Sequence, residues 1–169
     1  MAELAARERL QPSLLDRLTD NSPETRRESL DQQALSMTQL RQAVLRDIAW
    51  LLNTTNLEAV EDLELYPRVA ASALNFGVPG FTGMAAAGEK ASALEAAITA
   101  AVKRFEPRIR PESLRIKARE TEGDDGMPKL VFEIRGELWA QPLPQQLFLE
   151  TSIDIATRLA VVTDAKARG

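Results

Sequence analysis

The sequence predicts an α+β fold in which N-terminal helices pack on a small antiparallel β-sheet meander. In two segments, residues 36–56 and 89–106, apolar residues recur every three or four positions, the spacing of helices that bury one face. After Pro111 the apolar period changes to two, the spacing of strands that bury one face. Helices followed by consecutive strands are typical of a two-layer α+β domain.

The length and composition indicate one domain with peripheral segments. A chain of 169 residues that is 44% hydrophobic is long enough for one ordinary core. We predict a partly flexible N-terminal arm over residues 1–35, a single α+β domain over 36–164 and a flexible tail over 165–169. Pro12 and Pro23 interrupt the arm, where only "SLLDRLTD" has a short amphipathic pattern. Its leucines are expected to dock either on the chain's own core or on a neighbouring protein.

Two long helices and one short helix are expected before the sheet. The segment "SMTQLRQAVLRDIAWLLNTTN" carries a broad apolar stripe that stops at Asn53. Trp50 on this helix is expected in the core, because large apolar side chains are most often buried. A short helix begins at Pro67, and the glycine-rich "NFGVPGFTG" after it forms a loop that another backbone approaches closely. The second long helix, in "EKASALEAAITAAVKRFEPRI", must end at Pro107.

The second half of the chain predicts a four-stranded meander. The expected strands are "SLRIKARET", "KLVFEIRGELWA", "QLFLETSIDI" and "TRLAVVTD". Turn residues from Gly123 to Gly126 join the first two strands. Charged residues at alternate positions predict one solvated face of the sheet, and we assign no chemistry to it.

The composition excludes several classes of function. The chain has no cysteine and no histidine, which removes disulfides, thiolate nucleophiles, thiolate or imidazole metal sites and the usual general base near neutral pH. A net charge of −4 without a long basic block argues against nucleic acid as a partner. No signal-peptide pattern and no run of about 20 apolar residues is present, so we expect a cytoplasmic protein without membrane insertion. We predict no metal and no cofactor.

The stretch "FEPRIR", residues 105–110, is either a helix end or a binding site. As a helix end, Arg108 would cap the carbonyls of its own helix while Glu106 pairs with a neighbouring arginine. As a site, Pro107 would hold Glu106 and Arg108 in a fixed extended segment that presents both charges to a partner. A catalytic acid at Glu106 is a third interpretation, but Arg108 would lower its pKa and aromatic residues total only 5%. We assign no catalytic residue.

Five strings in order carry a family resemblance. They are "SLLDRLTDNSPE", "LRQAVLRDIAWLLNT", "YPRVAASALNFGVPGFTG", "FEPRI" and "FEIRGELWAQPLPQQLFLETSIDIATR". Together, from Ser13 to Asp164, they resemble TssE, the baseplate subunit of the type VI secretion system. TssE is similar to the small wedge protein of contractile phage baseplates, and such proteins have often been labelled lysozyme-like. The segments before Ser13 and after Asp164 match no pattern of this family.

The resemblance implies a structural role rather than an enzymatic one. Similar proteins sit in a bacterial cytoplasmic wedge near the inner membrane with TssF, TssG and TssK, around a hub that carries the spike and inner tube. They connect the baseplate to the first ring of the TssB/TssC contractile sheath. The resemblance implies that Glu106, Pro107 and Arg108 fasten the subunit to the TssF–TssG core. The alternatives are a peptidoglycan-cleaving, lysozyme-like enzyme that uses carboxylates, and an unrelated binding module.

The last two strands suggest a second contact. An open sheet edge has unpaired backbone groups that can accept a strand from another chain. In the resembled family the sheet is similar to the interlocking domain of the sheath, so the hairpin over residues 147–164 is the expected template for the first sheath ring. The candidate contact residues are Leu147, Leu149, Ile153, Ile155, Arg158 and Val161. The alternative is an edge protected by twist and by the charges of Arg158 and Asp164.

Overall fold

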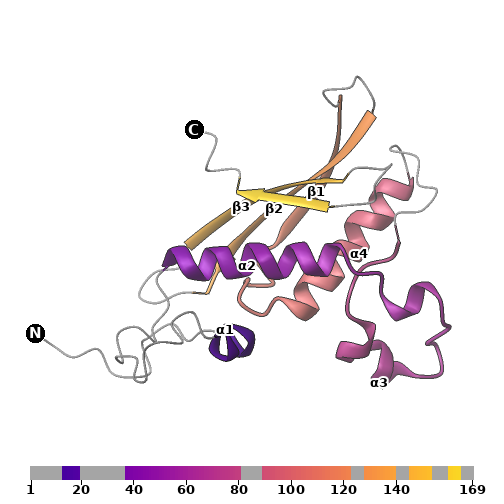
Figure 1. Cartoon of the computed structure of the whole chain (residues 1–169). Helices are drawn as coiled ribbons and strands as arrows, with labels where there is room; N and C mark the ends of the chain where they lie inside the picture. The colour runs from indigo at the N-terminus through magenta and orange to yellow at the C-terminus, as the bar shows by residue number, and fades with distance from the viewer. Residues whose placement is uncertain are drawn as a thin grey trace, which may run out of the picture.

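The chain forms a layer of helices on a four-stranded sheet (Figure 1). This computed structural model describes residues 13–19, 37–80, 89–122, 128–139, 145–153 and 160–164. The helical elements are α1 (Leu14–Leu18), α2 (Met37–Leu52), η2 (Leu57–Ala59), α3 (Pro67–Ala70), η3 (Ala73–Asn75) and α4 (Glu89–Phe105). The strands are β1 (Arg115–Glu122), β2 (Pro128–Leu138), β3 (Gln145–Ile153) and β4 (Ala160–Asp164). The predicted α+β fold is confirmed.

The four strands pair in sequence order as one antiparallel sheet, β1-β2-β3-β4. The register places Ile134 of β2 opposite Ile116 of β1 on one side and Leu149 of β3 on the other. The alternating pattern therefore puts one apolar row of each strand on the same face of the sheet. The turn predicted at Gly123 to Gly126 lies outside the described residues.

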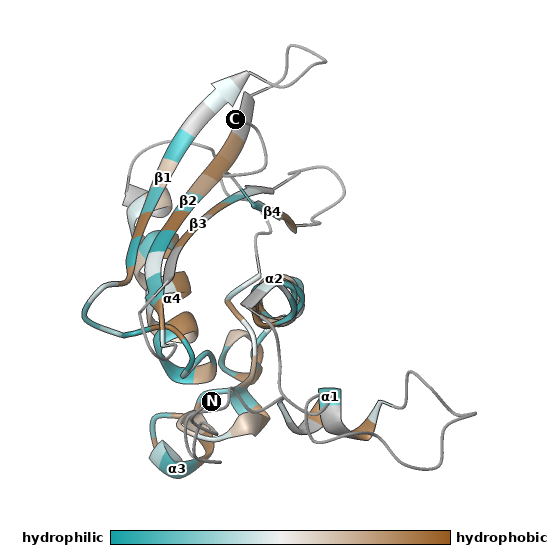
Figure 2. Ribbon diagram, turned by 90° about the vertical axis from the view of Figure 1, so that its left-hand side faces the viewer, coloured by the Kyte–Doolittle hydropathy of each residue, from teal (hydrophilic) through white to brown (hydrophobic). Residues whose placement is uncertain are grey.

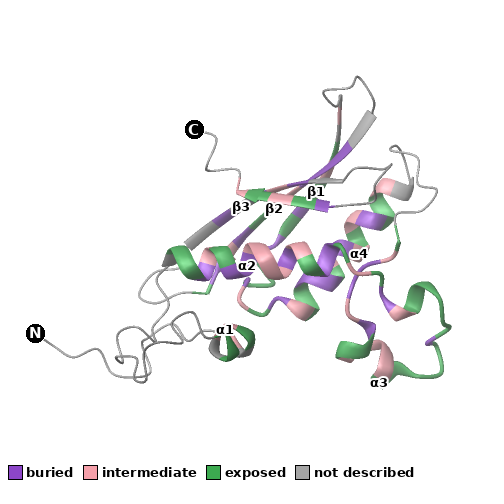
Figure 3. Ribbon diagram, viewed as in Figure 1, coloured by how far each residue is buried: buried purple, intermediate pink, exposed green. Residues whose placement is uncertain are grey.

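Helices α2 and α4 cover the apolar face of the sheet. Helix α2 packs against β4 and α4 against β1, as the view along α2 also shows (Figure 2). Buried and exposed residues alternate along α2 and α4 (Figure 3), and the buried ones share one core cluster with buried residues of the sheet. The largest fully buried side chains include Ile48 of α2, Ile98 of α4 and Phe132 of β2. Fully burying an apolar side chain of this size stabilises the fold by roughly 1.5–3 kcal/mol.

Trp50 does not belong to this core, so that prediction is wrong. Its side chain is half exposed, whereas Ile48 and Leu51 on the same helix are fully buried. Two residues advance an α-helix by about 200°, which places Trp50 on the side of α2 opposite to Ile48. The helical period therefore outweighs the general tendency of tryptophan to be buried.

Side chains of Arg41 in α2 and of Asn53, the residue after α2, fasten the two ends of β4. The Asn53 side chain accepts a hydrogen bond from the Ala160 N–H (2.9 Å) and donates one to the Ala160 carbonyl (2.9 Å). At the other end, Arg41 makes a bidentate ion pair with Asp164, with an Nη2–Oδ1 distance of 3.0 Å. These contacts fix the edge strand relative to the helical layer.

The glycine-rich loop packs closely on another backbone segment, as predicted for its described part. Gly77 has a φ of 124°, a conformation that favours glycine. The following Val78 forms a parallel bridge with Thr55, in which the Val78 N–H donates to the Thr54 carbonyl (2.9 Å). The short helix expected from Pro67 is divided into α3 and η3. None of the described helices is long and apolar enough to span a membrane.

Candidate functional site

The Glu-Pro-Arg motif forms a tight turn at the end of α4. The helix ends at Phe105, as the position of Pro107 predicts. The Ile109 N–H donates to the Glu106 carbonyl (3.2 Å), so residues 106–109 form a β-turn with proline in its favoured second position. Only one residue separates Glu106 from Arg108, and the turn brings their side chains together.

The segment after the turn pairs with the end of β2. The Trp139 N–H donates to the Arg108 carbonyl (2.7 Å), and the Arg110 N–H donates to the Glu137 carbonyl (2.9 Å). Ile109 packs closely on Gly136, where a side chain would meet the Ile109 Cγ2 atom at 2.8 Å. The sheet therefore sets the position of the turn and of the Arg108 side chain.

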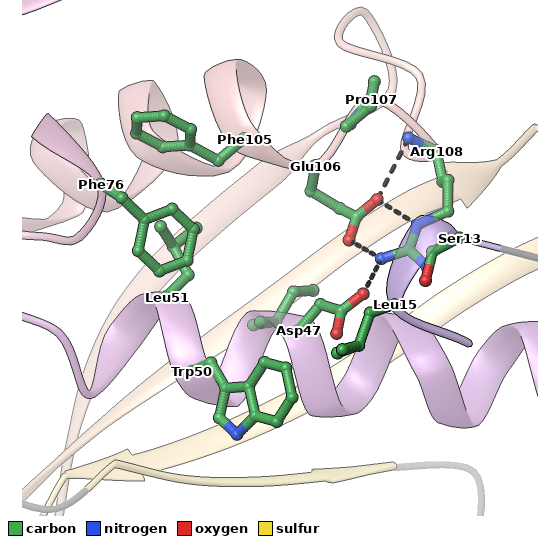
Figure 4. Close-up of a pocket in the computed structure, with 11 residues that line it drawn as sticks. Ser13, Leu15, Asp47, Trp50, Leu51, Phe76, Phe105, Glu106, Pro107 and Arg108 are labelled. Atoms are coloured by element: carbon green, nitrogen blue, oxygen red, sulfur yellow. Dashed lines mark hydrogen bonds and ion pairs between the residues drawn. The ribbon is translucent and has the colours of Figure 1, made fainter. Parts of the chain in front are cut away.

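Glu106 and Arg108 form an internal ion pair (Figure 4). The Glu106 carboxylate is only 3% exposed, and its Oε1 atom accepts hydrogen bonds from the Arg108 Nε (2.6 Å) and backbone N–H (3.2 Å). Its Oε2 atom pairs with the Arg108 Nη2 atom, which also donates to the Asp47 Oδ2 atom (2.6 Å). The prediction of an extended segment that presents both charges to a partner is thus wrong. The turn directs the two charges toward each other and toward α2.

The same contacts exclude the simple helix-end interpretation of the motif. Arg104 donates to the Ala70 carbonyl, and Arg110 lies 3.9 Å from a carboxylate oxygen of Glu137. Glu106 therefore pairs with Arg108 and not with the arginine on either side. The motif is a structural ion pair that joins the end of α4 to α2.

A chain of charges continues from Asp47 to α1. Arg46 donates from Nε to the Asp47 Oδ1 atom (2.8 Å) and from Nη1 to the Asp16 Oδ1 atom (2.6 Å). Its guanidinium also lies over the Trp50 ring, 5.1 Å from the centroid, in a cation–π contact. Ser13 caps α1 by accepting a hydrogen bond from the Asp16 N–H (3.3 Å). One network of ion pairs thereby connects α4, α2 and α1.

These contacts favour the charged forms of the network. Burial lowers the pKa of Arg108, but the hydrogen bonds and charges of Glu106 and Asp47 raise it more, so the net shift is upward. A hydrogen bond from Arg46 lowers the pKa of Asp16 below its ordinary value of 3.8. Because the pKa of Asp16 is lower when α1 is docked, this pair stabilises docking above about pH 3.8 and is lost as the pH falls through the lowered pKa.

A pocket of about 530 Å³ lies beside the ion pairs. It is lined by Ser13, Leu15, Asp47, Ile48, Trp50, Leu51, Phe76, Phe105, Glu106, Pro107 and Arg108. Phe76 and Phe105 stack edge to face in its wall, with ring centroids 5.2 Å apart (Figure 4). Apolar walls with a few fixed polar groups are typical of sites that bind a ligand or a partner side chain. Within the described ranges, no group of three or more acidic side chains could hold a metal ion.

A comparison with protein families decides the class of this chain. The model of baseplate wedge protein gp25 matches residues 38–143, more than half of the sequence. The chain belongs to the baseplate wedge protein gp25 family. This is also the family of TssE, so the resemblance is confirmed at the level of the family and supports a structural role of the phage-baseplate kind. No curated protein matches the chain.

The matched region of this gp25-family chain includes the motif and most of the pocket, but none of α1, β3 and β4. Sequence reasoning found Glu106, Pro107 and Arg108 and missed Asp47 and Trp50. Asp47 precedes Arg108 by 61 positions, and a single sequence carries no signal for a pair so far apart. The start of α1 did have a signal, because "SLLD" has the Ser-x-x-Asp spacing of a capped helix N-terminus.

The candidate sheath-contact residues of this wedge protein differ in their exposure to solvent. Leu147 and Leu149 are buried in the core, which corrects the expectation that their side chains contact a partner. The alternation of β3 turns them toward α2 and α4. Ile153 is the last residue of β3, while Ile155 and Arg158 lie outside the described residues. Val161 on β4 is 55% exposed and is therefore accessible to a partner.

Proposed function

We propose that this chain is the TssE-type subunit of a type VI secretion baseplate. It joins the wedge of TssF, TssG and TssK to the first ring of the contractile TssB/TssC sheath, in the bacterial cytoplasm near the inner membrane. The supporting observation is the pocket that the Glu-Pro-Arg turn forms with α2 in a chain of the gp25 family.

The motif acts by fixing the shape of the pocket. Arg108 occupies both carboxylate oxygens of Glu106, so the pair holds the turn against α2 instead of reaching toward a partner. The groups accessible to a partner are the exposed Pro107 and the half-exposed Trp50. Exposed aromatic side chains beside an apolar pocket are frequent hot spots of protein interfaces. We therefore place the TssF–TssG contact on this pocket and its rim.

Replacing Trp50 with alanine is expected to weaken binding to purified TssF–TssG by at least about tenfold, as loss of a hot-spot aromatic does. Isothermal titration calorimetry measures the Kd, and urea denaturation checks that the free energy of unfolding changes by no more than about 1 kcal/mol, the scale of the lost cation–π contact with Arg46. Tyr66→Ala is the matched control, because Tyr66 is 59% exposed and does not line the pocket. Equal affinities for both variants would refute the assignment of the contact to the pocket.

The sheath contact is placed at the edge strand β4. Asn53 binds the N–H and carbonyl of Ala160, so these groups point away from β3. Backbone groups of an antiparallel strand alternate in direction, so those of Val162 point to the same open edge. No further strand pairs with this edge among the described residues. A strand from a sheath subunit could pair at Val162 without displacing β3, while Asn53 keeps its hydrogen bonds to Ala160.

Val162→Pro tests this edge with little damage to the sheet. Proline removes an N–H that points away from β3, so no hydrogen bond of the sheet is lost, and edge strands tolerate proline. We expect several-fold fewer assembled sheaths in cells by fluorescence microscopy of a labelled sheath subunit, with unchanged binding to TssF–TssG. Val162→Ala, which keeps the N–H, is expected to assemble sheaths normally. Normal assembly in the proline variant would exclude strand pairing at this edge.

We propose no catalytic role for the carboxylates of the pocket. A glycosidase acid must carry a proton on an oxygen that can approach the leaving group. Both oxygens of Glu106 accept hydrogen bonds from Arg108, and both oxygens of Asp47 accept hydrogen bonds from Arg108 or Arg46. A turbidity assay on peptidoglycan is expected to show no clearing. Clearing that disappears in Glu106→Gln would contradict this proposal.

A further inference from the structure

The position of α1 suggests how access to the pocket is controlled. We propose that α1 is a cover docked on its own pocket, and that the wedge partner replaces it with a segment of the same chemistry, a carboxylate next to an apolar side chain. This inference rests on the proposed function of the pocket. It predicts that docking of α1 and binding of the partner are mutually exclusive.

The contacts of α1 are those of an exchangeable segment. Ser13 and Leu15 line the pocket, and Asp16 pairs with Arg46 (2.6 Å). Leu15, Asp16 and Leu18, the α1 residues whose side chains the structure describes, do not belong to the hydrophobic core, and a helix of five residues has little stability of its own. Partly exposed ion pairs contribute little stability. The segment can therefore leave the pocket without disturbing the rest of the fold.

The docked segment also leaves apolar surface exposed. Leu15 is 43% exposed and Leu18 is 74% exposed although α1 lies on the pocket. A partner that buries more apolar surface there would displace it, because burial of apolar area is the main favourable term in association. The sequence leaves open whether these leucines dock on the chain itself or on a neighbouring protein. Once displaced from the pocket, α1 can dock on a neighbouring protein.

Two arginines indicate the chemistry of the partner: Arg108 lines the pocket, and Arg46 lies beside it in contact with Asp47 and Trp50. Arg46 already binds one carboxylate of α1 and would lack that acceptor after α1 leaves. The Arg46 Nη2 and Arg108 Nη1 atoms are buried, and neither has a hydrogen-bond acceptor among the described residues. A buried N–H group without an acceptor is unfavourable, and a carboxylate is the strongest partner for a guanidinium. The exposed ring of Trp50 and the Phe76–Phe105 pair accommodate the apolar side chain.

Asp16→Lys in the full-length chain tests the cover. It places a lysine opposite Arg46, and the repulsion should release α1 while the core remains intact. We expect the amides of residues 13–19 to exchange hydrogen at least about tenfold faster, and the Kd for purified TssF–TssG to fall about threefold or more, since a competitor is removed. Glu61→Lys is the matched control, because Glu61 is exposed and lies outside the pocket.

Arg46→Gln tests whether docking of α1 and binding of the wedge partner use the same guanidinium. It removes the guanidinium that both ligands use, so we expect fast exchange of α1 together with a higher Kd. When the wild type binds, either of two results for Asp16→Lys would overturn the proposal. Weaker binding would show that α1 belongs to the interface, and unchanged binding would show that α1 is irrelevant to it. If no form binds TssF–TssG, the proposed function fails. In that case faster exchange in Asp16→Lys still supports the cover, and unchanged exchange overturns it.

Discussion

Replacing Arg108 with alanine is expected to lower the free energy of unfolding by about 3 kcal/mol, the typical cost of removing one partner from a buried ion pair. Glu106 is 3% exposed, and without the guanidinium it keeps only the hydrogen bond from the backbone N–H of residue 108 (3.2 Å). The turn would then hold an unpaired charge between α4 and α2. Urea denaturation of the full-length chain, followed by circular dichroism, measures this loss.

Two further variants show whether the loss comes from the buried charge. Asp47→Asn is expected to cost less than about 1 kcal/mol, because Asp47 is 25% exposed and Arg108 keeps its bonds to Glu106. The double variant Glu106→Ala/Arg108→Ala should be less destabilised than the sum of the two single variants, because it leaves no unpaired charge. A change below about 0.5 kcal/mol for Arg108→Ala would show that the pair does not stabilise the fold.

The structural role of the ion pair affects how variants of the Glu-Pro-Arg motif are interpreted. A Glu106 or Arg108 variant that fails to bind its partner has lost either a contact or the structure of the pocket. Binding must therefore be compared at equal folded fraction, or tested at Trp50, whose side chain is accessible and does not belong to the core.

Replacing Gly77 with alanine is expected to destabilise the chain by about 3 kcal/mol, the sum of a strained φ and a steric clash. Gly77 has a φ of 124°, and an added Cβ would press on the Thr54 carbonyl and lie 2.9 Å from the Asn56 backbone nitrogen. Both neighbours are backbone atoms of the bridge between Thr55 and Val78, so neither can move without breaking its hydrogen bonds. The adjacent Phe76 forms a wall of the pocket, and partner binding should weaken as well.

Gly136→Ala is the comparison for this prediction. Its added Cβ would lie 2.8 Å from the Ile109 Cγ2 atom, a side-chain atom that can shift, so the expected loss is about 1–2 kcal/mol. Thermal unfolding monitored by circular dichroism ranks the two variants. If Gly77→Ala unfolds at the same temperature as Gly136→Ala or higher, the positive φ and the close backbone approach do not constrain this loop.

Periodicity predicted the fold because one-dimensional spacing determines which residues share a face. The stripe on α2, the end of α4 before Pro107 and the alternation of β1 and β2 all depend on neighbours in the sequence. The direction of the Glu106 and Arg108 side chains depends instead on Asp47, which comes from another helix. A single sequence carries no information on that contact, so it predicts the end of α4 at the motif but not the direction of the motif's charges.

Trp50 shows an error of a different kind, whereas the short amphipathic pattern at Ser13 does form the helix α1. The helical period itself places Trp50 opposite to Ile48, and at this position it outweighs the average tendency of tryptophan to be buried. The Ser13-x-x-Asp16 spacing marks the start of α1, although the arm around it is polar. Both patterns are local and can be recognised in the sequence, whereas the pocket beside them depends on contacts between residues far apart in the chain.

The most direct test of the central claim, that the wedge partner binds at this pocket, is photo-crosslinking in cells that carry the complete secretion system. A photoreactive amino acid replaces Trp50 at the rim of the pocket, or Leu65, which is 85% exposed and does not line the pocket. We predict a covalent product with TssF or TssG from position 50 and none from position 65. A product with these subunits from position 65, with none from position 50, would contradict the claim.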